Sequence, residues 1–185
     1  GIKPIFGCDV WLTHDAERDQ PFRALLLAQS RSGYLKLAEW LTRAYRSNQY
    51  RGRAEMRHEW FDEGTDGLIA LSGARSGEVG SALLQGNAAG ARKAGERWSA
   101  SFPCRYYLEV QRAGHADDDA LVAATVRVAS ELGLPVVATH PVQFLRRQSA
   151  VAVLLLQVAA EVLGRVVQQV ARQRARGDGV EHLLV

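Results

Sequence analysis

The hydrophobic residues of the first 145 positions fall into two alternating patterns. Short apolar runs predict strands, at 2–12, 24–28, 67–73, 106–110 and 134–138. Between them, apolar residues recur every three or four positions, as in amphipathic helices, at 32–45, 78–84, 88–101 and 117–132. The run Ala24–Ala28 contains no polar residue and predicts a strand that is buried on both faces. The polar stretch Ser47–Arg57 predicts a loop.

This alternation of strands and helices predicts an α/β fold with a mostly parallel sheet or barrel. In such folds the functional side chains gather in the loops that follow the C-terminal ends of the strands. We therefore look for candidate residues in five loops, at Cys8–Thr13, Gln29–Gly33, Ser72–Gly77, Gln111–His115 and Thr139–Phe144.

Residues 146–185 have a different composition, in which Val, Ala, Leu, Arg and Gln dominate. We treat residues 1–145 as one domain and this segment as a divergent tail with a predicted helix at about 149–174. A membrane span is disfavoured because Glu161 and Arg165 would lie near mid-bilayer. The tail is either an amphipathic helix or the product of reading a GC-rich gene out of frame, and the abrupt change favours the second interpretation.

The net positive charge of the chain comes from this tail. Residues 1–145 hold 17 Lys and Arg against 17 Asp and Glu, whereas the tail holds six Arg against three acidic residues. The domain is therefore not a general polyanion binder. Two distant cysteines, Cys8 and Cys104, with no signal sequence, favour the reducing cytoplasm. The chain opens beside a strand without Met, which predicts a segment of a longer protein.

Five segments occur in an order that resembles a known family: GIKPIFGCDVWL, LLLAQSRSGYLKLAEWLTRAY, GLIALSGARSGEVGSALLQGN, FPCRYYLEVQRAGHADDDALV and LGLPVVATHPVQFL. They are similar to the PHP (polymerase and histidinol phosphatase) domain of the bacterial DNA polymerase III α subunit, and the last resembles proteobacterial versions. The resemblance implies an α/β fold, a distorted (β/α)7 barrel related to the TIM barrel, with a metal cluster at one mouth. The HxH strand that opens active members is absent, so the barrel is expected to lack its first strands.

In active members the cluster holds up to three divalent ions on His, Asp, Glu and sometimes Cys, and it hydrolyses phosphate esters. Such ligands hold neighbouring transition-metal ions and lower the pKa of a bridging water. By resemblance, one acidic ligand position falls on Asp9 and keeps a carboxylate. The other positions fall on residues that are not useful ligands, namely Arg23, Ala74, Pro141 and Gln143. We therefore expect no cofactor and no catalytic residue here.

Other chemistry-bearing residues have ordinary interpretations. His115 and His140 follow strand ends, and we interpret both as loop histidines, as we do His14 and His58 in polar stretches. The turn at 72–77 resembles a phosphate-binding turn but lacks the Walker lysine. Its candidate anion contact is therefore Arg75 alone. Adjacent strand residues point to opposite faces, so Cys8 is expected to pack away from the side of Asp9.

The expected function is that of a non-catalytic structural module in bacterial DNA replication. The resemblance implies three partners: the rest of the polymerase α subunit, the proofreading exonuclease (ε) subunit, and DNA through the parent enzyme, whose polymerase domains use Mg. Two alternatives stay open. One is a metal-dependent phosphoesterase or 3′–5′ exonuclease that uses Zn or Mn. The other is a nucleic-acid-binding module that uses the arginines of the tail.

Overall fold

The structure, a computed structural model, describes residues 4–141. Its strands are β1 (Phe6–Leu12), β2 (Phe22–Ala28), β3 (Gln49–Tyr50), β4 (Arg53–Met56), β5 (Leu68–Leu71), β6 (Tyr106–Val110) and β7 (Val136–Ala138). The α-helices are α1 (Arg31–Ser47), α2 (Glu78–Leu84), α3 (Ala88–Ser101) and α4 (Asp118–Leu132), with 3-10 turns η1 (His58–Glu63) and η2 (Ala74–Ser76). Gln143 and the predicted helix at 149–174 lie outside the described residues.

The strands form one seven-stranded sheet in the order β3-β4-β1-β2-β5-β6-β7. Strand β1 is parallel to β4, and β2 is antiparallel to both β1 and β5. Because β5, β6 and β7 are mutually parallel, five of the seven strands run in one direction. Only β2 and β3 run against them. The predicted α/β fold with a mostly parallel sheet is therefore confirmed for the described residues.

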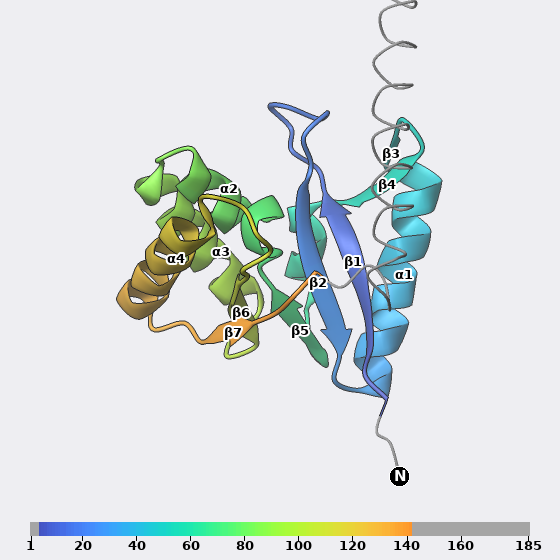
Figure 1. Cartoon of the computed structure of the whole chain (residues 1–185). Coiled ribbons are helices and arrows are strands. Elements are labelled where there is room, and N and C mark those ends of the chain that lie inside the picture. The colour runs from blue at the N-terminus through green and yellow to red at the C-terminus, as the bar shows by residue number, and fades with distance from the viewer. Residues whose placement is uncertain (1–3, 142–185) are drawn as a thin grey trace, which may run out of the picture. The chain divides into compact units, whose positions relative to one another are not determined.

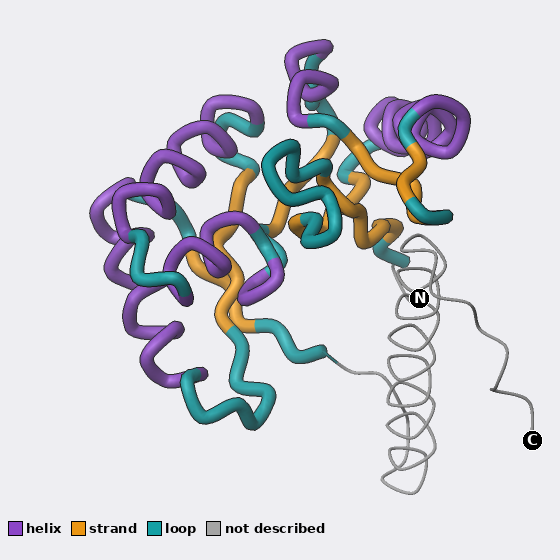
Figure 2. Tube along the Cα trace, turned by 90° about the horizontal axis from the view of Figure 1, so that it is seen from above, coloured by secondary structure: helices purple, strands orange, loops and turns teal. Residues whose placement is uncertain are grey.

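The buried hydrophobic residues come from both the sheet and the helices, whose arrangement is drawn in Figure 1. One sheet face carries alternate residues that are buried, namely Val10, Leu12, Ala24, Leu26, Leu68, Ala70, Tyr106 and Leu108. Trp40 of α1 and Trp98 of α3 are the largest fully buried side chains of this core. The view from above shows the helices flanking the strands (Figure 2). None of the helices among residues 4–141 is both long and apolar enough to cross a bilayer.

Local sequence signals explain where the helices begin. Ser30 caps α1 by accepting a hydrogen bond from the Gly33 backbone N–H at 3.1 Å, and Asn87 caps α3 in the same way. Gly33 also lets α1 approach the loop before β5, because a Cβ there would lie 1.9 Å from the Gly67 carbonyl oxygen. These contacts fix the start of α1 against the sheet.

Two predictions about local structure are wrong. The polar stretch Ser47–Arg57 is not a loop but contains the hairpin β3–β4, whose turn places both Arg51 and Gly52 at positive φ. The hairpin was missed because its residues are polar. The strand containing Ala24–Ala28 is not buried on both faces, since Leu25 and Leu27 stay partly exposed on the side away from the helices.

Candidate functional site

The C-terminal ends of the five co-directional strands meet at one edge of the sheet, as the fold predicts for a functional site. On the face away from the helices, the register places Trp11 of β1 between Arg23 of β2 and Glu55 of β4. Glu109 of β6 lies on the same face, where it reaches Gly73. We call this region the strand-end face and define it by Asp9, Arg23, Gly73, Glu109 and Thr139.

Asp9 and Arg23 form a two-pronged ion pair across β1 and β2. The Arg23 Nε donates to Asp9 Oδ1 at 3.0 Å, and Nη2 lies 2.7 Å from Oδ2. Both carboxylate oxygens thus have a cationic partner. Cys8, the residue before Asp9, packs against the core on the opposite, helix-covered face of the sheet, as predicted. The structure therefore brings together two of the sequence-predicted positions, and it joins them to each other.

Ala74 and Arg75 lie in η2, directly after β5. Ala74 is buried and adopts a positive φ of 47°, and its methyl group offers no ligand atom. The Arg75 guanidinium donates to Asp117 at 3.1 Å through each of its two Nη atoms and to Asp118 at 3.2 Å. The hydrogen bond from Arg75 is the main reason that the pKa of Asp117 is lowered. Contact of Arg75 with an external anion stays a prediction.

The strand-end face also contains a buried acid that the sequence reasoning missed. Glu109 is 6% exposed and accepts hydrogen bonds from the Gly73 backbone N–H at 2.6 Å and the Thr139 hydroxyl at 2.9 Å. The Ser72 hydroxyl accepts from the Glu109 backbone N–H. The signal was present, since Glu109 is the only charged residue in the strand Tyr106–Val110. These bonds tie the ends of β5, β6 and β7 together.

The remaining predicted positions are not joined to Asp9. His115 and His140 are exposed, and Pro141 follows β7 in the chain. The His115 backbone N–H donates to Asp118, while no side-chain hydrogen bond of His115 or His140 is seen within residues 4–141. Across the same described residues, no three His, Cys, Asp or Glu side chains come close enough to hold one metal ion.

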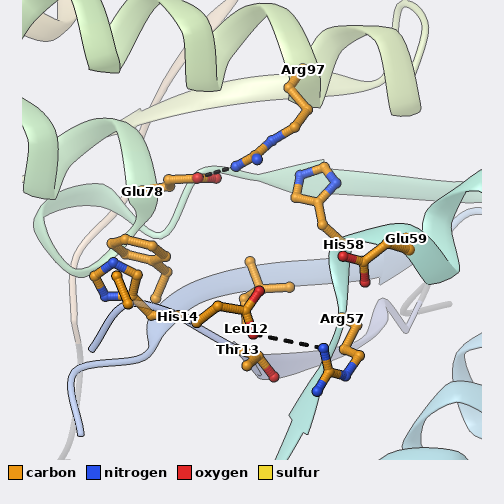
Figure 3. Close-up of a pocket in the computed structure, with 11 residues that line it drawn as sticks. Leu12, Thr13, His14, Arg57, His58, Glu59, Glu78 and Arg97 are labelled. Carbon is orange, nitrogen blue, oxygen red and sulfur yellow. Dashed lines mark hydrogen bonds and ion pairs between the residues drawn. The ribbon is translucent and has the colours of Figure 1, made fainter. Parts of the chain in front are cut away.

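A second candidate site is a cavity of about 230 Å³ on the helix-covered side (Figure 3). Its wall is formed by the loops after β1 and β4, by η1, by the first residue of α2 and by α3. The residues labelled in the figure are Leu12, Thr13, His14, Arg57, His58, Glu59, Glu78 and Arg97. Arg97 forms an ion pair with Glu78, whose second oxygen accepts from the Trp98 indole at 3.0 Å. The three carboxylates of this cavity (Asp15, Glu59 and Glu78) outnumber its two arginines (Arg57 and Arg97), so its charge does not favour an anion.

This cavity is not evident from the sequence. His14 and His58 lie in separate polar stretches of the sequence, but the structure brings both to the cavity wall. The His14 ring packs on Phe22 with centroids 4.5 Å apart and lies 3.2 Å from the Gln20 carbonyl oxygen. His58 lies between α3 and η1, with its Nε2 buried and without a hydrogen-bond partner in the described part of the chain. Burial, followed by the nearby Arg97 charge, lowers the pKa of His58.

Comparisons with known proteins find one family model and several relatives that match most of this chain. The family model described as "PHP domain" matches residues 1–113. The chain is 47% identical over 150 residues to the DNA polymerase III subunit alpha of Neisseria meningitidis serogroup A. It is 40% identical over 148 residues to that of Pseudomonas aeruginosa and 37% identical over 145 residues to that of Escherichia coli K12.

These matches cover 78–80% of this chain but only 12–13% of each relative. The chain thus spans a small part of the length of the curated relatives, and it resembles one segment of a DNA replication protein. The mixed α/β sheet with its helices is compatible with a PHP-type fold. Because the family model covers more than half of the sequence, the chain belongs to the PHP domain family.

Proposed function

We propose that the chain is a structural, non-catalytic segment of the α subunit of a bacterial replicative DNA polymerase III. The relatives from Neisseria meningitidis, Pseudomonas aeruginosa and Escherichia coli are such subunits, which supports a role in DNA replication. The role proposed for the segment is to scaffold the rest of the α subunit and to dock the proofreading exonuclease subunit. Contact with DNA then belongs to the parent enzyme, and the place of action is the bacterial cytoplasm.

The observation that carries the non-catalytic proposal is the Asp9–Arg23 ion pair. Each oxygen of Asp9 is in contact with the guanidinium of Arg23, which competes with a metal ion for the lone pairs of the carboxylate. A guanidinium carries a permanent positive charge and repels a cation that approaches the same carboxylate. Ala74 and Pro141, at two of the other ligand positions that the resemblance implies, supply no side-chain ligand atom. The described residues therefore do not fit a transition-metal cluster, and we derive no hydrolytic step from them.

The proposal includes closure of the sheet into a distorted barrel by further strands of the parent protein. Its support is the uneven burial of the sheet. On the helix-covered face Val10, Ala24 and Leu26 are buried. On the other face Leu25, Leu27 and Ile69 remain partly exposed. Further strands of the α subunit would cover these apolar side chains, which is the usual driving force for such packing.

A metal and activity measurement tests the non-catalytic proposal. The chain is equilibrated with Zn²⁺ or Mn²⁺, the bound metal is counted, and hydrolysis of a model phosphodiester is followed. We expect no stoichiometric metal and no turnover above that of the Asp9→Ala variant. Stoichiometric binding together with hydrolysis that Asp9→Ala abolishes would establish the phosphoesterase or 3′–5′ exonuclease alternative instead.

A binding measurement tests the docking role separately. The chain is titrated with the proofreading exonuclease subunit from a proteobacterial replicase, and complex formation is followed by calorimetry. We expect a saturable one-to-one complex that persists in a chain shortened to residues 1–145. If the shortened chain alone fails to bind, the tail is the docking element. If neither chain binds, the docking proposal is wrong while the scaffold proposal still stands.

A further inference from the structure

His58 occupies an unusual place for a polar side chain. Its ring is packed edge-on against Trp98 of α3, with centroids 4.9 Å apart, and against Phe61 of its own turn at 5.2 Å. The Nε2 atom is buried and makes no hydrogen bond with any residue among 4–141. A buried imidazole nitrogen normally has a partner, so its absence needs an explanation.

We propose that His58 is a pH-sensitive latch that holds η1 (His58–Glu63) against α3 while its imidazole is neutral. The neutral ring serves as an apolar plug between Phe61 and Trp98. A proton on Nε2 would create a cation at a buried atom that has no acceptor, which is costly unless the ring moves to water. The inference concerns the helix-covered side and does not rest on the function proposed for the strand-end face.

The charged groups around His58 oppose its protonation. Arg97 of α3 faces it and disfavours a second positive charge. Glu78 of α2 and Asp62 of η1 act in the opposite sense, but Glu78 already pairs with Arg97 and with the Trp98 indole. Loss of solvent outweighs both carboxylates, so the pKa of the ring is lowered. The other titratable groups that line the same cavity are His14, Asp15, Arg57 and Glu59.

The contact is local enough to open without unfolding the sheet. The turn η1 is held by short-range backbone hydrogen bonds, from Trp60 to Arg57 at 3.1 Å and from Gly64 to Phe61 at 3.0 Å. Residues 57–59 also form one wall of the 230 Å³ cavity (Figure 3). Release of His58 would therefore move this wall and widen the cavity, whereas the paired strands keep their ladder.

Hydrogen exchange of the intact chain tests the latch. With exchange corrected for its intrinsic pH dependence, protection of the Trp60 and Gly64 amides should fall by up to about tenfold between pH 7.5 and 5.5. This range lies across the ordinary histidine pKa of about 6.5. The Ser72 amide, which donates to Tyr107 across β5 and β6, should keep its protection. Equal loss at all three amides would show global unfolding and overturn the proposal.

Two variants and one titration complete the test. His58→Phe keeps an aromatic plug without a titratable nitrogen and should abolish the pH-dependent loss at Trp60 and Gly64. The matched control His14→Gln removes a histidine from the same cavity and should leave that loss unchanged. The ring of His58 is also titrated by NMR in the unmodified chain, so the test stands if His58→Phe does not fold. A raised pKa, as attraction to the Trp98 ring would produce, overturns the proposal.

Discussion

Arg23 of β2 bonds both carboxylate oxygens of Asp9 on β1, at 3.0 and 2.7 Å. The pair is solvent-accessible, since its side chains are 40% and 54% exposed. Exposed ion pairs contribute about 0–1 kcal/mol. Asp9→Asn should therefore lower the free energy of unfolding by less than about 1 kcal/mol, as measured by urea denaturation.

This prediction has an internal control in salt. At about 1 M NaCl the difference between Asp9→Asn and the unmodified chain should shrink, because surface charges are screened. A double-mutant cycle with Arg23→Gln isolates the pairwise interaction. If Asp9→Asn instead lowers the free energy of unfolding by several kcal/mol, and this decrease does not change with salt concentration, Asp9 has a buried partner.

In contrast to the exposed Asp9, the side chain of Glu55 is fully buried. It accepts from Arg18 Nε at 3.3 Å, from Arg53 Nε at 3.0 Å and from the Thr13 hydroxyl at 3.1 Å. Glu55→Gln keeps the shape but loses the charge and one acceptor oxygen. Because hydrogen bonds to charged groups contribute about 1.5–3 kcal/mol, we expect a loss of about 2–4 kcal/mol in the free energy of unfolding.

The matched control is Glu63→Gln, which removes an exposed acid that pairs with Arg43. It should cost less than about 1 kcal/mol. If both variants lose the same small amount in urea denaturation, Glu55 does not organise the β1, β4 and Arg18 contacts.

The contrast between Asp9 and Glu55 shows what the sequence could and could not predict. Apolar spacing predicted the ends of α2, α3 and β6 well, because burial against one sheet face imposes that spacing. It missed β3 and β4, because their stability comes from a tight turn at Arg51–Gly52 and from the buried acid Glu55 rather than from an apolar pattern.

The site shows the same division. The family resemblance pointed to Asp9 and Arg23, but only the register of β1 against β2 puts them within hydrogen-bond distance. The helix-side cavity could not be predicted, because it joins His14 and His58 through elements distant in the sequence. A polar residue inside an apolar strand, as at Glu109, was the one available signal, and the interpretation did not use it.

Gly33 tests the packing of α1 on the loop before β5. A Cβ at this position would lie 1.9 Å from the Gly67 carbonyl oxygen and 2.4 Å from its carbonyl carbon, so backbone must shift. Gly33→Ala raises helix propensity by about 1 kcal/mol, but overpacking costs about 1–3 kcal/mol or more. We expect net destabilisation, measured as a lower midpoint in thermal unfolding.

The control for this change is Arg31→Ala in the same helical turn. Arg31 is exposed, so the substitution adds helix propensity without a clash. It should leave the midpoint unchanged or raise it slightly. A Gly33→Ala chain as stable as Arg31→Ala would mean that α1 is not held against Gly67.

Asp118 predicts a specific loss of stability in acid. Its Oδ2 accepts from the backbone N–H groups of Ala113, Gly114 and His115 at 2.7–3.0 Å. Burial acts to raise the pKa of Asp118, but these three bonds outweigh it and the pKa is lowered. A carboxylate with a lowered pKa binds fewer protons in the folded state, so its contribution is present above the unfolded pKa and is lost as the pH falls through the folded pKa.

Asp118→Asn should therefore lower the thermal midpoint at pH 7, and the difference from the unmodified chain should narrow below about pH 4, near the ordinary Asp pKa. Melting curves between pH 2.5 and 7 measure both effects. The neighbouring Asp119→Asn is the control, because Asp119 is 83% exposed and its ion pair is with Arg112, which is itself exposed. Its curve should follow that of the unmodified chain at every pH. A constant difference for Asp118→Asn down to pH 2.5 would mean that the shape of the loop, and not the charge of Asp118, stabilises the start of α4.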